Sequence, residues 1–231
     1  MKLVLIPGLD GTADLFADFI HALRTVNPAG VVECQAIAYP PDREMDYAGH
    51  EAHVRERLPA DDFVLLAESF SGPVGVSIAA APPPNLKGLI LCCSFASNPL
   101  PLFGPLSRLI AAFPAMKIPP RLFAPFLYAG RATPELRRAH ANAMAKVKAS
   151  TLRARVAAIL AADHSAQLRR IGVPMLYLRA RQDRLVPASA LREIERLRPD
   201  MLVEEFDAPH FLLQTEPWRC AGAVDRFLAY R

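Results

Sequence analysis

The sequence predicts an α/β fold: a doubly wound, mostly parallel sheet with helices on both faces and one helical insertion. Short runs of Val, Leu and Ile alternate with longer segments of helical periodicity over most of the 231 residues. Such alternation is typical of parallel strands joined by right-handed helical crossovers. One stretch, residues 95–164, interrupts the alternation, and no repeat or low-complexity linker marks a separate domain. We therefore expect one domain with an inserted segment.

Six short segments that are apolar or rich in β-forming residues are predicted strands, because such runs suit buried parallel strands. They are Lys2–Ile6, Val31–Tyr39, Phe63–Ala67, Leu86–Cys93, Met175–Arg179 and Leu202–Phe206. Five segments between or after them have helical patterns, namely Ala13–Arg24, Ala48–Leu58, Ser71–Ala81, Ser189–Arg196 and Pro217–Tyr230.

The insertion has two halves of different composition. The first half is crowded with prolines, which interrupt long helices, so we expect short, broken helices there. The second half predicts two helices, because Thr133 is a good N-cap, Pro134 suits the first helical position and Ala-rich sequence follows. We expect residues 1–94 and 165–231 to form the core, and residues 95–164 to form a helical lid over the carboxyl edge of the sheet.

The overall composition predicts a folded, cytoplasmic protein. Hydrophobic residues make up 52% of the chain and charged residues 22%. A disordered chain has fewer hydrophobic residues, so this composition indicates a folded protein. No segment approaches the run of about 18 apolar residues that a membrane span needs. The apolar start, Met1–Ile6, is too short for the core of a signal peptide.

The four cysteines, Cys34, Cys92, Cys93 and Cys220, are expected to be free thiols. None of them forms a Cys-x-x-Cys pair, so neither a metal site nor a dithiol redox motif is indicated. Cys92 and Cys93 are adjacent in a predicted strand, where neighbouring side chains point to opposite faces. We expect these thiols to be buried in a protein of a reducing compartment.

Positive charge is concentrated in the insertion. Between Phe95 and His164 there are ten Lys or Arg and two Asp or Glu, a net charge of +8, while the rest of the chain carries −4. Two interpretations remain open: the excess is a solvated face, or it meets an anionic carrier or surface. A nucleic-acid partner is not indicated, because these basic residues lie in an apolar segment without a stacking motif.

Ser69 is the strongest candidate for a catalytic nucleophile. It follows the predicted strand Phe63–Ala67 and stands directly before a helical pattern. Ala67 and Ser71, two positions to either side, are small enough for the tight strand-to-helix turn that exposes a serine hydroxyl. The N-terminus of the following helix would stabilise negative charge that develops at this turn.

His210 and Asp183 are the candidates for the base and its partner. His210 follows the last predicted strand, at the sheet edge from which it could reach Ser69 and take its proton. Asp183 lies in the loop after the strand Met175–Arg179, where it could fix the histidine tautomer and stabilise the imidazolium. The alternatives are an ordinary surface or core histidine, and an aspartate that caps the next helix or pairs with a neighbouring arginine.

The chain order serine, aspartate, histidine resembles that of the α/β-hydrolase superfamily, and the resemblance extends over nearly the whole chain. The segment Leu3–Thr12 is similar to the oxyanion loop of that superfamily, with Pro7 in place of the usual histidine. The resemblance places the oxyanion-binding backbone N–H groups at Leu9 and Phe70; an ordinary glycine turn is the alternative. The two antiparallel strands that usually precede this loop have no counterpart here, so we expect a sheet of only the six strands named above.

The resemblance implies a serine hydrolase of carboxylesterase or thioesterase type that needs no metal and no organic cofactor. An apolar lid favours a small hydrophobic ester, cleaved through an acyl-enzyme intermediate. A thioester on an acyl carrier is one alternative, because a basic lid would attract an anionic carrier. The other is a non-catalytic small-molecule-binding protein on the same scaffold.

Overall fold

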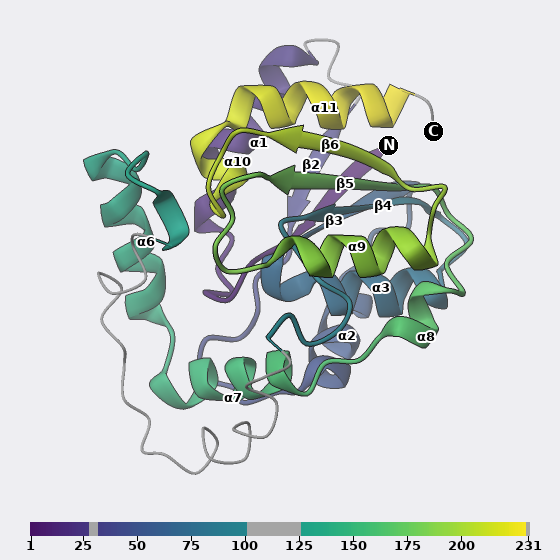
Figure 1. The fold of residues 1–231 in the computed structure, drawn as a ribbon, viewed down its shortest axis with the longest axis horizontal. Coiled ribbons are helices and arrows are strands. Elements are labelled where there is room, and N and C mark those ends of the chain that lie inside the picture. The colour runs from purple at the N-terminus through teal and green to yellow at the C-terminus, as the bar shows by residue number, and fades with distance from the viewer. Residues whose placement is uncertain (28–31, 101–125, 230–231) are drawn as a thin grey trace.

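The fold is a six-stranded, entirely parallel sheet between two layers of helices (Figure 1). The computed structural model describes residues 1–27, 32–100 and 126–229 of the chain. The strands lie in the order β2-β1-β3-β4-β5-β6. Their bounds are β1 Lys2–Ile6, β2 Glu33–Ala36, β3 Phe63–Glu68, β4 Leu86–Cys92, β5 Met175–Ala180 and β6 Leu202–Phe206. The predicted fold class and the six-stranded sheet are confirmed.

The helices are divided between the two faces of the sheet, as a doubly wound fold requires. Their bounds are α1 Ala17–Val26, α2 Tyr47–Arg55, α3 Gly72–Ala80, α6 Pro134–Lys146, α7 Ala149–Leu160, α8 Ser165–Leu168, α9 Ala188–Leu197, α10 Leu212–Thr215 and α11 Pro217–Ala229, with 3₁₀ turns η1 Asp14–Phe16 and η2 Ser69–Ser71. Helices α1 and α11 pack together on one face, and α2, α3, α8 and α9 cover the other (Figure 1). Among the described residues, no helix is long and apolar enough to cross a bilayer.

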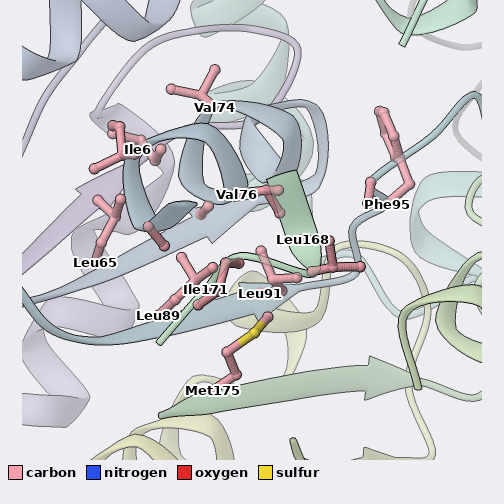
Figure 2. Packing of buried hydrophobic residues seen from close by; sticks show 14 of the residues in the cluster. Ile6, Leu65, Val74, Val76, Leu89, Leu91, Phe95, Leu168, Ile171 and Met175 are labelled. Carbon is pink, nitrogen blue, oxygen red and sulfur yellow. The ribbon is translucent and has the colours of Figure 1, made fainter. Parts of the chain in front are cut away.

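Alternate residues of each central strand pack into two separate apolar cores, one on each face of the sheet. In β3, Leu65 packs into the cluster beneath α3, while Leu66 packs into the cluster beneath α1 and α11, and both side chains are fully buried. Figure 2 shows the first cluster, where Leu89 and Leu91 of β4 lie below Val76 of α3. Because β3 and β4 are buried on both faces, nearly every position is apolar and the polar alternation of an exposed strand is missing.

Helix α3 approaches the sheet closely enough to require small residues on both sides. A Cβ atom on Gly75 would lie 2.9 Å from Cβ of Ala67 and 3.0 Å from Cδ1 of Leu89. Gly75 therefore allows the helix to sit directly on β3 and β4, and a side chain larger than alanine at position 67 would be forced into the same space. This contact fixes the strand-to-helix turn at the end of β3.

The described part of the insertion forms α6 and α7, the two helices that the sequence predicts there. The Thr133 hydroxyl accepts a hydrogen bond from the N–H of Leu136, and Pro134 occupies the first turn, as the capping pattern predicts. Helix α6 lies beyond the carboxyl ends of the strands, and α7 lies near α2 (Figure 1). Most of the proline-rich half, residues 101–125, is outside the described residues, so the expectation of short, broken helices stays a prediction.

Candidate active site

The turn after β3 holds Ser69 in an unusual backbone conformation. Ser69 has a φ angle of 48°, in the left-handed region that residues other than glycine rarely adopt. Two hydrogen bonds hold the turn: the Ser94 hydroxyl donates to the carbonyl of Ser69 over 2.5 Å, and the Tyr47 hydroxyl donates to the carbonyl of Phe70 over 3.1 Å. Such a conformation costs about 1–3 kcal/mol and persists only where surrounding contacts impose it. It is the geometry of a strand–nucleophile–helix elbow.

His210 reaches this serine from the loop after the edge strand β6, at the same carboxyl edge of the sheet. It lies in the loop between β6 and α10, and only 6% of its side chain is exposed. The distance between Oγ of Ser69 and Nε2 of His210 is 2.9 Å, a normal hydrogen bond between residues 141 positions apart. The structure thus brings the predicted nucleophile and the predicted base into direct contact.

Asp183 holds the opposite nitrogen of the same ring. Its Oδ2 lies 2.7 Å from Nδ1 of His210, and its Oδ1 accepts the backbone N–H groups of Leu185 and Val186 at 2.8 and 2.9 Å. The two N–H groups anchor one carboxylate oxygen and leave the other for the imidazole. With Nδ1–H donated to Asp183, Nε2 is the unprotonated nitrogen and can accept the proton of Ser69.

The environment of His210 raises the pKa of its imidazole. Burial lowers the pKa of the imidazole, but the negative charge of Asp183, its hydrogen bond and the charge of Glu68 outweigh burial, so the pKa lies above the usual value. A base with a raised pKa holds an abstracted proton more firmly. The arrangement can therefore take a proton from Ser69 and keep the resulting imidazolium paired with a carboxylate.

The loop after β1 lies directly beside the nucleophile. The N–H of Gly11 donates to the carbonyl of Gly8 over 3.0 Å and closes a tight turn, and a Cβ atom on Gly8 would lie 3.8 Å from Cβ of Ser69. The Ser71 hydroxyl, which hydrogen-bonds to the Tyr39 hydroxyl, donates to the carbonyl of Pro7 and ties the loop to the elbow. Leu9, predicted as an oxyanion donor, is a central residue of this turn.

Several side chains around this centre were not among the predicted site residues. Glu68 is 7% exposed and accepts a hydrogen bond from Nε2 of Gln214 at 2.9 Å, and burial raises its pKa to about 7. Ser94, after β4, holds the elbow, but nothing in its sequence context distinguishes it from a loop serine. Arg155 of α7 is fully buried and contacts the loop after β1.

One group near the centre has the composition of a metal site. Ligand atoms of Cys93, Asp183 and His210 lie within 4.8 Å of one another. However, the facing atoms of Asp183 and His210 already bond to each other, and burial raises the pKa of the Cys93 thiol, which disfavours the thiolate that binds metals. The donor set suits a hydrogen-bonded relay better than an ion, and we assign no metal to it.

Comparison with known families places most of the chain in a family of hydrolases. A family model described as serine aminopeptidase, S33, a family of α/β-hydrolases, matches residues 43–202, more than half of the chain. The chain belongs to this α/β-hydrolase family. A search of curated protein sequences finds no match.

Solved structures similar to this α/β-hydrolase share its fold at low sequence identity. An esterase from Exiguobacterium antarcticum is 14% identical with a TM-score of 0.82, and the match covers 99% of this chain and 92% of the esterase. An enol-lactonase from Burkholderia xenovorans is 18% identical with a TM-score of 0.81, covering 99% and 91%. A hydrolase from Pseudomonas aeruginosa is 23% identical with a TM-score of 0.79, covering 98% and 89%. At these identities the likeness establishes the fold alone.

Proposed function

We propose that this α/β-hydrolase is a serine hydrolase that cleaves a carboxylic ester of a small hydrophobic substrate through an acyl-enzyme. The observation that carries the proposal is the continuous hydrogen-bonded relay from Ser69 through His210 to Asp183, with distances of 2.9 and 2.7 Å. A serine hydroxyl is a poor nucleophile until a base accepts its proton, and this relay supplies such a base.

In the proposed reaction, Oγ of Ser69 attacks the carbonyl carbon of the ester while Nε2 of His210 takes the hydroxyl proton. The carbonyl oxygen becomes an oxyanion, for which the backbone N–H groups of Leu9 and Phe70 are the proposed donors. The tetrahedral intermediate collapses, and His210 returns the proton to the alcohol that leaves. Water then attacks the acyl-enzyme by the same proton path and releases the acid and free Ser69. No metal or organic cofactor takes part in this scheme.

The charge of the insertion bears on the choice between an ester and a carrier-bound thioester. Of its described basic residues, Arg131, Arg138, Lys146 and Lys148 each lie within ion-pair distance of a carboxylate on this chain. These pairs offset part of the positive charge that would otherwise attract an anionic carrier. We therefore place the ester first and keep a thioester on an acyl carrier as the second candidate, with residues 95–164 as the proposed lid over either substrate.

The test is a fluorophosphonate labelling experiment together with a substrate panel. The panel contains p-nitrophenyl esters of increasing acyl length, acyl thioesters and lactones, the last because a structural neighbour is an enol-lactonase. Ser69→Ala should abolish labelling and lower kcat by roughly 10⁴-fold or more, while Ser189→Ala, at an exposed serine, should change neither. A folded wild-type protein that shows no labelling and turns over no member of the panel would refute the proposal and favour a binding protein on this scaffold.

A further inference from the structure

The buried side chain of Arg155 points to a role other than packing. Arg155 lies on α7 and none of its surface is exposed to solvent. A buried guanidinium loses its hydration, and such a loss is normally offset by a carboxylate partner. Within residues 1–27, 32–100 and 126–229, no carboxylate oxygen lies within 4.0 Å of its nitrogens, so the charge of Asp10 stabilises the guanidinium only from a greater distance, and its Nε has no hydrogen-bond partner.

What Arg155 does bind is main chain. Its Nη1 donates to the carbonyl oxygens of Leu9 and Asp10, both over 2.9 Å, and its Nη2 donates to the carbonyl of Pro40 over 3.1 Å. Its Cζ lies 5.7 Å from the centroid of the Tyr39 ring, a distance at which the ring face attracts a cation. One guanidinium thus joins α7 to two loops at the carboxyl edge of the sheet.

Leu9 and Asp10 are the two central residues of the turn that the Gly11 N–H closes on the Gly8 carbonyl. Arg155 therefore holds both central carbonyls of that turn. Gly11 has a φ angle of 68°, and a Cβ atom there would lie 2.3 Å from Nη1 of Arg155, so the turn and the guanidinium fit only with glycine at this position. The Asp10 carboxylate, which the charge of Arg155 attracts, accepts the backbone N–H and the hydroxyl of Thr12.

We propose that Arg155 is a positioning residue for the oxyanion loop: by binding the carbonyls of Leu9 and Asp10, it fixes the turn whose Leu9 N–H stabilises the oxyanion. This inference rests on the proposed hydrolase function. It extends that function by making α7, a helix of the insertion, part of the apparatus that orients the site. Arg155 acts through the main chain and has no direct contact with the reacting atoms in this role.

The experiment compares Arg155→Met with Arg155→Lys and with Arg198→Met. Arg198 is the control for the loss of a buried arginine: its Nη1 also donates to a main-chain carbonyl, that of Ile171, away from the site, and it additionally pairs with the Asp200 carboxylate. Each variant is measured by thermal unfolding, by hydrogen exchange of the amides of residues 8–12, and by kcat and KM for the best ester of the panel. Lysine keeps the charge but lacks the planar fork that spans several carbonyls, so it should rescue only part of the loss.

We expect Arg155→Met to lower kcat by about 10- to 100-fold with KM changed by less than about threefold, and to accelerate exchange in residues 8–12 by at least about tenfold. Arg198→Met should destabilise the fold without either effect. If Arg155→Met does not fold, the same comparison is made with Arg155→Lys.

Unchanged exchange in residues 8–12, or a change in kcat no larger than that of Arg198→Met, would overturn the inference. If wild-type protein instead lacks Ser69-dependent hydrolysis, the proposed function fails, and the exchange rates still decide whether Arg155 holds the turn.

Discussion

Replacement of Glu68 by glutamine tests the electrostatics of the site through protein stability. Glu68 is buried beside the nucleophile, and burial raises its pKa from 4.5 to about 7, with the charge of Asp10 adding to the effect. The folded protein therefore holds the carboxyl proton more tightly than the unfolded chain does. Its unfolding free energy should be highest while Glu68 is protonated, and should fall as pH rises from about 4.5 to about 7.

The size of this effect follows from the two pKa values. One pKa unit corresponds to about 1.4 kcal/mol, so ionisation of Glu68 removes at most about 3 kcal/mol of stability by pH 8. Glutamine resembles the protonated carboxyl and carries no charge. Its amide can also donate to Oε1 of Gln214, a buried atom without a partner among the described residues.

The measurement is urea unfolding of wild type, Glu68→Gln and Glu56→Gln at several pH values between 4.5 and 8. The stability of Glu68→Gln relative to wild type should rise with pH and approach about 3 kcal/mol at pH 8. Glu56→Gln, at a side chain that is 71% exposed, is the control and should show no such trend. A difference between Glu68→Gln and wild type that stays constant over this range would refute the reasoning.

Three further substitutions test the site and the residues that hold it in place. Asp183→Asn should lower kcat by about 10⁴-fold and shift the acid limb of the kcat/KM profile to lower pH, because the charge of Asp183 raises the pKa of His210; an unmoved limb would contradict this. Arg131→Ala removes hydrogen bonds to the carbonyl and the carboxylate of Asp207. It should lower kcat/KM several-fold and destabilise the fold by less than about 1 kcal/mol. Unchanged kinetics would contradict this prediction. Gly75→Val should destabilise the fold by about 1–3 kcal/mol or more in urea unfolding, because its side chain has no space against β3 and β4; wild-type stability would contradict the packing.

The parts of the fold that depend on local pattern were predictable from sequence. The bounds of β1 and β6 agree with the predicted ranges, although only β1 is a continuous apolar and largely buried run, and β6 carries Glu204 and Glu205. The second strand is shorter than predicted, Glu33–Ala36 instead of Val31–Tyr39. It lies at the sheet edge, and from Ile37 onward the chain turns toward the site, where Tyr39 bonds to the elbow. Apolar character alone does not distinguish pairing in a strand from burial in a loop.

Cys92 and Cys93 show where the alternation rule fails. The two thiols were expected on opposite faces of a strand, but both pack in the core beneath α1 and α11. β4 ends at Cys92, and Cys93 has a φ angle of 46°, which turns its side chain away from the pleat. The expectation was wrong because it assumed that the strand continues through Cys93. As expected, both thiols are free and buried.

The residues that support the site were harder to predict than those at its centre. Motif and chain order singled out Ser69, Asp183 and His210, which the fold brings together. Nothing comparable marked Arg155, whose partners are main-chain atoms 115 to 146 positions earlier in the chain. The available signal was its place on the buried stripe of α7 with Thr151 and Ala158, an unusual place for an arginine.

The central claim is that Ser69 forms a covalent acyl intermediate. The most direct measurement is rapid acid quenching of the protein during turnover of a p-nitrophenyl ester, followed by intact-mass and peptide mass spectrometry. The account predicts one added acyl group on the peptide that contains Ser69, and no adduct in Ser69→Ala. Ester hydrolysis by wild type with the acyl group on another residue, or undiminished hydrolysis by Ser69→Ala, would contradict it.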